Sequence, residues 1–279
     1  MAIKRILAVL SGGDPDAAVA RAAVQVAGRL SAHVDGLYVR GDFFDTMPYV
    51  EGSMSESALS REFAAAQERR QQCEDRARES FDAALAQSDA ADIVAEFEAV
   101  DGRVLDIVGH RGRVYDLAIL SPMGNYPGVA PEDVVASALF DTGRPVLVMP
   151  DDAPATLGRR VLVGWNRGSQ AARAVAGALP LLRGAEKVTI AHVETGAKTG
   201  PGPEELQANL ACHGVDSEVM LIAQPSGSVS NTLSEAAAEV SADLMVLGAF
   251  SHSRLRETIF GGVTSHFIKR LQLPTLMAH

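Results

Sequence analysis

The chain has 279 residues, of which 47% are hydrophobic and 22% are charged. This composition is typical of a globular protein and excludes a disordered chain, and the length suits two domains of ordinary size. The net charge of −10 at pH 7 argues against a nucleic-acid-binding surface, because non-specific binding to DNA or RNA needs clustered Lys and Arg.

Cysteine usage and the start of the chain indicate the cellular compartment. Cys73 and Cys212 lie far apart and form no Cys-x-x-Cys or Cys-His pattern, so we expect them to be reduced and unreactive. The first apolar run, Ile6–Leu10, is too short for a signal-peptide core, and no apolar run approaches membrane-spanning length. We therefore predict a cytoplasmic protein.

The first half of the chain alternates short apolar runs with segments of helical periodicity. The apolar runs predict buried strands at residues 6–10, 33–39, 96–100, 117–121 and 145–149. Helices are predicted from about residue 16 to 30, with Asp14 or Asp16 as a cap, from about 56 to 87, and over 104–111 and 132–140. Strands that alternate with helices predict a parallel sheet covered on both faces.

A loop rich in large apolar residues precedes the long helix. It runs from Gly41 to about residue 55 and contains Phe43, Phe44, Met47, Pro48, Tyr49 and Val50. So many apolar side chains rarely remain in water, so this loop is a candidate lid or partner contact. The helix that follows has an apolar stripe, including Phe63, Ala77 and Phe81, which we expect to pack on the sheet.

After a proline-rich linker at 150–158, the same order of elements begins again. Strands are predicted at 161–165, 187–194, 217–222, 244–247 and 275–278, with helices at 169–182, 204–213 and 229–241 and a last one after Gly261-Gly262. Asp116-Leu-Ala-Ile-Leu aligns with Asp243-Leu-Met-Val-Leu, which indicates an internal repeat. We therefore predict two homologous domains, at residues 1–150 and 158–279.

The stretch from Asp243 to Arg270 is the candidate binding site. A predicted strand ends at Gly248, a polar loop with Arg254 and Arg256 follows, and Gly261-Gly262 then open a helix. The first turn of a helix favours an anion, and glycines let the anion approach the backbone closely. The stretch is thus a plausible phosphate-binding loop, although the glycines could simply end a strand and begin a helix.

The spacing of this loop resembles the nucleotide-binding signature of the universal stress protein family. That signature is Gly, two residues, Gly, nine residues, Gly, then Ser or Thr. Gly248 and Gly261 match it, Ser251 replaces the second glycine, Gly262 stands at the first hydroxyl position, and Thr264 matches the next one. The residues around the loop and the closing Leu-Pro-Thr-Leu-Met-Ala-His are also similar to the family.

Two further positions are carried over from the family. Its ATP-binding members usually have an aspartate at the end of the first strand, where this chain has Asn166. An amide can hydrogen-bond a base or sugar but brings no charge. Val193 matches a position whose backbone meets the adenine, so the identity of its side chain matters little.

The resemblance implies a fold and a function. The fold is α/β, with two flavodoxin-like (Rossmann-like), doubly wound, five-stranded parallel sheets in tandem, related by a pseudo-twofold axis with their fifth strands in contact. The protein would act as a stress-response binding or signalling protein, as a pseudo-dimer within one chain or as a homodimer. ATP or another adenine nucleotide, with Mg²⁺ as a companion ion, would be held in the second domain by Asn166, Val193, Gly248, Ser251, Gly261, Gly262, Val263 and Thr264.

The internal repeat predicts which domain holds the nucleotide. Superposing the first copy on the second places Ser121 on Gly248, Gly124 on Ser251, Val134 on Gly261, Val135 on Gly262 and Ser137 on Thr264. Two glycines of the loop become valines in the first copy. Because a β-branched side chain would occupy the space of a phosphate, we expect the first copy to be degenerate.

Sequence motifs typical of several other functions are absent or incomplete. There is no P-loop, no dinucleotide-binding Gly-x-Gly-x-x-Gly after the first strand, and no close pair of histidines suited to a metal. Ser11-Gly12-Gly13-Asp14-Pro15-Asp16 is close to the pyrophosphate loop of adenylating enzymes, but its aspartates fall at the fourth and sixth positions instead of the fifth.

We assign no catalytic residue and expect a protein that is not an enzyme, with slow ATP hydrolysis left open. The other alternative is a stress protein that binds no nucleotide and acts through protein contacts, for example through residues 43–50.

Overall fold

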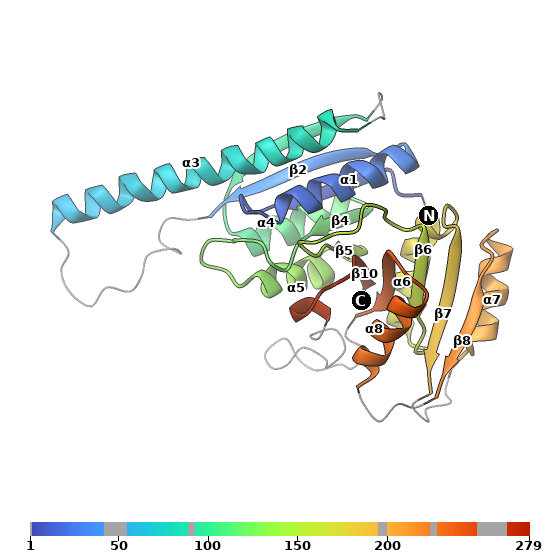
Figure 1. The fold of residues 1–279 in the computed structure, drawn as a ribbon. Helices are drawn as coiled ribbons and strands as arrows, with labels where there is room; N and C mark the ends of the chain where they lie inside the picture. Colours follow the sequence, from blue (N-terminus) through green and yellow to red (C-terminus); the bar gives the residue numbers. More distant parts are fainter. Residues whose placement is uncertain (1, 42–54, 89–92, 195–199, 224–227, 250–266) are drawn as a thin grey trace. The chain divides into compact units, whose positions relative to one another are not determined.

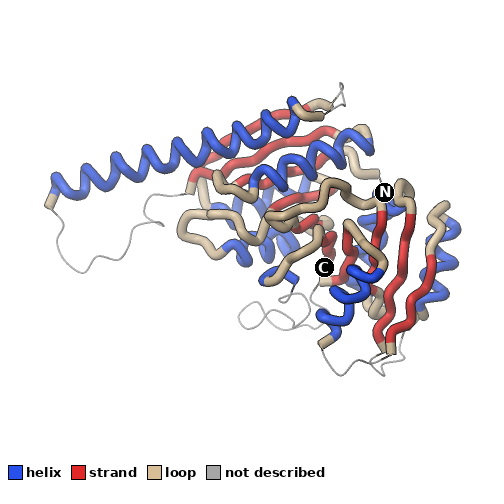
Figure 2. The backbone as a smooth tube through the Cα atoms, in the orientation of Figure 1, coloured by secondary structure: helices blue, strands red, loops and turns tan. Residues whose placement is uncertain are grey.

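The structure is a computed structural model of the chain, in which residues 2–41, 55–88, 93–194, 200–223, 228–249 and 267–279 are described. The chain divides into two compact units. Lys4–Thr142 form the N-terminal unit, and Gly143–His279, with the first residues of the chain, form the C-terminal unit. In both units strands alternate with helices (Figures 1 and 2).

The N-terminal unit contains a parallel sheet with the strand order β3-β2-β1-β4. Its elements are β1 (Arg5–Leu10), α1 (Asp16–Leu30), β2 (His33–Arg40), α3 (Glu56–Ala86), β3 (Ala95–Asp101), α4 (Val104–Arg111), a short 3-10 helix (Gly112–Val114), β4 (Leu117–Leu120) and α5 (Pro131–Asp141). All of β4 is buried, as expected of a strand that is covered on both faces.

The C-terminal unit has the strand order β5-β10-β9-β6-β7-β8. Its elements are β5 (Val146–Val148), β6 (Arg160–Gly164), α6 (Ser169–Leu182), β7 (Lys187–Val193), α7 (Pro203–Cys212), β8 (Glu218–Ile222), α8 (Val229–Glu239), β9 (Leu244–Gly248) and β10 (Thr275–Ala278). Residues 267–269 are helical. β5 pairs with β10 antiparallel, which confirms the predicted contact of the two fifth strands, and the other pairs are parallel.

The α/β fold and the order of its elements agree with the sequence prediction. The limits of each predicted strand lie within one residue of the observed limits, and those of the predicted helices lie within two. The helix predicted after Gly261-Gly262 is the exception, because its start lies outside the described residues. Because β5 pairs with β10, it belongs to the C-terminal unit of the structure although the sequence repeat assigns it to the first copy. The predicted domain limits at 150 and 158 follow the sequence repeat and remain a prediction.

The same backbone interaction occurs at the start of both repeats. An aspartate immediately before the fourth strand, Asp116 or Asp243, accepts hydrogen bonds from two successive backbone N–H groups at the start of the first strand. The donor–acceptor distances are 2.8 Å for Lys4, 3.1 Å for Arg5, 3.1 Å for Arg159 and 2.9 Å for Arg160. This equivalence fixes the alignment of the two copies, with Arg5 on Arg160.

The long helix α3 packs on the sheet over only part of its length. Ala77, Phe81 and Ala84 are buried, but Phe63, which the sequence placed in the packing stripe, is 44% exposed. Its 31 residues span about 46 Å, whereas the eight residues of β2 span about 26 Å. The N-terminal part of α3 therefore extends beyond the strands (Figure 1).

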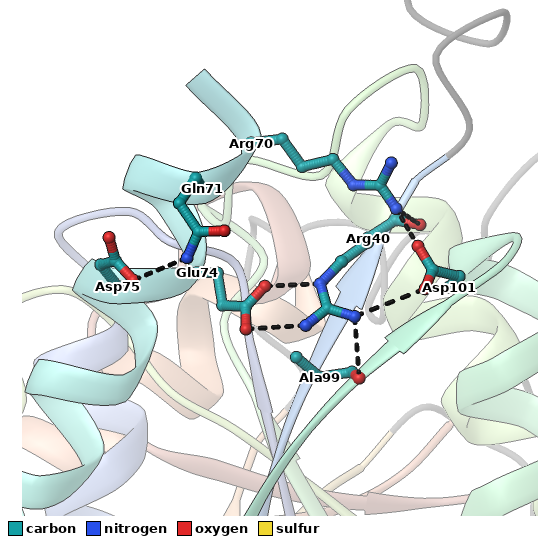
Figure 3. Close-up of polar contacts among 7 residues, drawn as sticks. All are labelled: Arg40, Arg70, Gln71, Glu74, Asp75, Ala99 and Asp101. Atoms are coloured by element: carbon teal, nitrogen blue, oxygen red, sulfur yellow. Dashed lines mark hydrogen bonds and ion pairs between the residues drawn. The ribbon is translucent and has the colours of Figure 1, made fainter. Parts of the chain in front are cut away.

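A network of charged residues attaches α3 to the ends of β2 and β3 (Figure 3). Glu74, which is 7% exposed, accepts hydrogen bonds from Nε and Nη2 of Arg40 at 2.5 and 2.8 Å. Arg40 Nη1 also donates to Ala99 O at 3.2 Å and contacts Asp101, which pairs with Arg70. The hydrogen bonds to Glu74 raise the pKa of Arg40 above its ordinary value, so the guanidinium remains charged.

We expect the substitution Glu74→Gln to lower the free energy of unfolding by about 2 kcal/mol, because it leaves the Arg40 guanidinium without its buried counter-charge. Urea denaturation measures this change. Glu62→Gln is the matched control, since Glu62 is paired with Arg69 on the same helix but both side chains are exposed, and it should cost less than about 0.5 kcal/mol. Equal costs for the two variants would contradict this account.

Candidate functional site

Asn166, Val193 and Gly248 lie at one edge of the C-terminal sheet. Val193 and Gly248 are the last residues of β7 and β9, and Asn166 follows β6 by two residues. β6 lies between β9 and β7 and is parallel to both, so all three residues lie at the carboxyl ends of adjacent strands. In doubly wound sheets, ligands bind at this edge, where the order of strands reverses.

The other candidate positions, Ser251, Gly261, Gly262, Val263 and Thr264, lie outside the described residues. Their assignment to a phosphate-binding loop remains a prediction.

Gly248 is required by packing. A Cβ atom at this position would lie 2.4 Å from the backbone nitrogen of Ala171 and 2.8 Å from the carbonyl carbon of Gln170. Real Cβ atoms do not approach backbone so closely, so the end of β9 can contact the first turn of α6 only through a glycine. This contact explains Gly248 without a ligand, and it brings the first turn of α6 to the edge of the sheet.

Asn166 is exposed and shapes the loop between β6 and α6. Its Oδ1 accepts a hydrogen bond from the backbone N–H of Gly168 at 2.9 Å. The amide oxygen therefore helps to form the turn, and the amide nitrogen is the group suited to donate to a ligand. Where the family usually has a charged carboxylate, this chain has a neutral hydrogen-bond donor.

Val193 can meet a ligand only through its backbone, because its side chain is 7% exposed. The β6–β7 pairing ends at Gly164 and Ala191, with the N–H of Trp165 donating to Ala191 O. Val193 therefore lies beyond the residues that pair with β6, although it still pairs with Ile222 of β8. The expectation that its backbone meets the adenine remains a prediction.

The loop after β6 is joined to the loop before α7. The indole N–H of Trp165 donates to Pro201 O at 3.0 Å, and Nδ1 of His192 lies 2.7 Å from Trp165 O. Arg167 contacts Gly200 O through Nη1 and His192 Nε2 through Nη2, both at 3.5 Å. His192 lies in β7 and is 7% exposed.

A cavity of about 330 Å³ lies beside these loops, between α6 and α7. Trp165, Val175 and Leu206 contribute its apolar lining, and Asn209 is among its polar groups. Trp165 is the only tryptophan in the chain, so its fluorescence reports specifically on this part of the molecule.

In the N-terminal unit, the corresponding loop binds a carboxylate of its own. Asp16 accepts hydrogen bonds from the backbone N–H of Ser11 at 2.9 Å, the Ser11 hydroxyl at 2.9 Å and the backbone N–H of Gly12 at 2.7 Å. Asp16 is 2% exposed, and burial raises its pKa while these hydrogen bonds oppose that rise. The expectation that an aspartate caps α1 is therefore corrected, since Pro15 is the cap residue and Asp16 bonds back to the preceding loop.

This carboxylate also weighs against the adenylating-enzyme alternative, because the N–H groups of Ser11 and Gly12 that would bind a pyrophosphate already bind Asp16. The matching position in the C-terminal unit, five residues after Asn166, is Ala171, which has no such group.

Two further contacts occupy space at this edge in the N-terminal unit. A Cβ on Gly12 would lie 2.5 Å from Cβ of Cys73, so α3 packs directly over the loop. The ring of Tyr126, which is 6% exposed, packs against Gly124, at the position that matches Ser251. These contacts supply a physical reason, beyond Val134 and Val135, to expect no nucleotide in the N-terminal unit.

Among the described residues, no helix is long and apolar enough to cross a membrane. Within the same residues there is also no group of three or more His, Cys, Asp or Glu side chains that could hold a metal ion.

A comparison with protein-family models finds a match in the second half of the chain. Residues 158–279 match the model of the Universal stress protein family. No curated protein matches the sequence.

Solved structures with a similar fold extend over nearly the whole chain. A universal stress protein from Archaeoglobus fulgidus is 15% identical, with 98% of this chain and 97% of that chain covered and a TM-score of 0.70. A putative universal stress protein from Pseudomonas aeruginosa is 16% identical, with 99% and 93% covered and a TM-score of 0.57. At these identities the likeness shows the fold alone, and it agrees with the α/β architecture described above.

The contact between Gly248 and α6 predicts that Gly248→Ala lowers the free energy of unfolding by about 1–3 kcal/mol, because the added methyl group must displace helix backbone. Gly202→Ala is a control in the same unit, since a Cβ there would meet only the ends of two flexible side chains, Glu204 at 3.0 Å and Glu205 at 3.8 Å. Thermal unfolding of both variants measures the difference. A Gly248→Ala protein as stable as the control would contradict the close approach.

Proposed function

The chain carries a universal stress protein domain in residues 158–279, and from this premise we propose that it is a stress-response binding protein that holds ATP or another adenine nucleotide in its C-terminal unit. The observation that carries the proposal is the meeting of Asn166, Val193 and Gly248 at the carboxyl edge of the sheet, where β6 and β9 are adjacent. The site would work in the cytoplasm, where Cys73 and Cys212, both free, remain reduced.

Each group has a specific role in the proposed site. The backbone at Gly248, Ser251 and Gly261–Val263 and the hydroxyl of Thr264 would bind the phosphates, with Mg²⁺ as a companion ion. The amide nitrogen of Asn166 would donate to the sugar or the base, and the backbone of Val193 would meet the adenine. We assign these groups binding roles and no part in catalysis.

The contrast between the two units supports placing the nucleotide in the C-terminal unit. In the N-terminal unit the matching loop donates its N–H groups to Asp16, and Tyr126 and α3 occupy the adjacent space. A carboxylate at this position would also repel a phosphate. The C-terminal unit has Ala171 in place of Asp16, so it lacks this fixed negative charge.

A second function, binding of a protein partner, is favoured by one observation on α3. The helix extends beyond the strands, and Phe63 on this part is 44% exposed. The apolar loop at 43–50, which precedes this helix, lies outside the described residues. The two functions are compatible, since an adenine nucleotide could regulate a protein contact.

The first test of nucleotide binding is to denature the purified protein, identify the released small molecules by mass spectrometry, and titrate the emptied protein with ATP. We expect about one adenine nucleotide per chain, and a change in Trp165 fluorescence on titration, because Trp165 precedes Asn166. If no nucleotide is released and ATP does not bind, the proposed nucleotide function is wrong.

A substitution that copies the first repeat into the second tests the location of the site. We expect Gly261→Val to raise the dissociation constant for ATP by about tenfold or more, because the valine side chain occupies space that a phosphate needs. The melting temperature, measured in parallel, should remain close to that of the wild type. Undiminished ATP affinity in this variant would place the site elsewhere.

A further inference from the structure

One position with a left-handed backbone carries a glycine in the first copy and an arginine in the second. The copies align with Arg5 on Arg160, so Gly12 and Arg167, each seven residues further on, are equivalent. Both have a left-handed backbone, with φ of 76° at Gly12 and 66° at Arg167. Glycine adopts this conformation without steric cost, whereas an arginine is disfavoured there.

The other described non-glycine residues with positive φ have an ordinary structural reason. Ser31 and Ser241, with φ of 48° and 51°, follow the ends of α1 and α8, where a left-handed residue commonly terminates a helix. Arg167 lies between a strand and the helix that follows it, so helix termination does not account for its conformation. Strained residues of this kind concentrate at functional sites.

The side chain of Arg167 has a definite position at the proposed site. Its guanidinium lies 3.5 Å from Gly200 O and 3.5 Å from Nε2 of His192, a residue of β7. Its Cβ and carbonyl oxygen pack against Gly200, where an added Cβ would lie 3.1 and 3.0 Å from them. The group thus lies on the β7 side of Asn166, where the backbone of Val193 is proposed to meet the adenine.

The chemistry of a guanidinium defines what it can recognise. Arginine offers only N–H donors, arranged in a planar fork, and it remains charged at every relevant pH. The ring nitrogens of a purine are hydrogen-bond acceptors, and its flat face can stack on the guanidinium plane. The chain as a whole has a net charge of −10, which would repel an anion. The positive charge of Arg167 opposes this repulsion locally and so favours an anionic ligand at this edge.

We propose that Arg167 is a specificity-determining residue of the nucleotide site, where its guanidinium contacts the purine base, with His192 and Gly200 positioning it. This inference rests on the proposed nucleotide function. It gives a role to an arginine that has a disfavoured backbone conformation, whereas Gly12 in the N-terminal copy leaves room for α3.

The test compares ATP binding by the full-length wild type with that of the variants Arg167→Gly, Arg167→Lys and Ser241→Gly. Arg167→Gly removes the side chain and suits the left-handed backbone, so we expect ATP affinity to fall about tenfold while the melting temperature stays at or above that of the wild type. Arg167→Lys keeps the charge but lacks the planar fork, so it should lose most of the same affinity. Ser241→Gly makes the same backbone change before β9, at the opposite edge of the sheet, and should bind ATP as the wild type does.

The outcomes separate this inference from the function on which it rests. If the wild type binds no nucleotide, both are overturned. If the wild type binds ATP and Arg167→Gly binds it equally well, only the role of Arg167 is overturned. The role is also overturned if Arg167→Lys binds as the wild type does, since charge alone would then suffice, or if the melting temperature of Arg167→Gly falls together with affinity, since Arg167 would then hold the loop rather than the ligand.

Discussion

The direct contact between the end of β9 and the first turn of α6 is the constraint on which the C-terminal unit depends. Because Gly248 has no side chain, backbone packs on backbone where β6 and β9 lie side by side. The contact sets where α6 begins, and through α6 it sets the short loop that carries Asn166 and Arg167. The indole of Trp165 and the ring of His192 then join this loop to its neighbours.

The two repeats share a backbone framework but use the carboxyl edge of the sheet in different ways. The equivalent aspartates Asp116 and Asp243 make the same pair of hydrogen bonds, which shows how closely the frameworks correspond. At the opposite edge, the N-terminal unit supplies its own anion, Asp16, and fills the space around it with Tyr126 and α3. In the C-terminal unit, Ala171 stands at the position of Asp16, so the matching loop has no carboxylate of its own there.

Much of the fold could be predicted from the sequence, because buried parallel strands are short apolar runs and the helices between them have clear periodicity. The exposure of Phe63 could not be predicted in this way. An apolar stripe indicates which side of a helix packs, but it does not indicate where the strands beneath the helix end.

From the sequence, only those residues of the candidate site that belong to a recognisable spacing pattern or to the repeat could be predicted. The convergence of Asn166, Val193 and Gly248 follows from strand order, which the repeat and the family resemblance supply. The sequence did not predict the role of Asp16, because a carboxylate near the start of a helix usually caps that helix. Here Asp16 instead accepts hydrogen bonds from the loop that precedes α1. The sequence analysis did not single out Arg167, because its left-handed backbone conformation cannot be read from the residue type. The alignment of Arg167 with a glycine, Gly12, was the signal that could have indicated this conformation.

The antiparallel pairing of β5 with β10 has a consequence for how the chain can be divided. Residues 146–148 precede the linker, yet their hydrogen-bonding partner is the last strand of the chain. A fragment that begins at 158 would lack this strand, and the buried, apolar β10 would become an open sheet edge. Such edges recruit strands from other molecules, so the isolated second half would tend to dimerise or aggregate. The linker is thus a poor place to cut the protein, even though it marks the start of the second repeat.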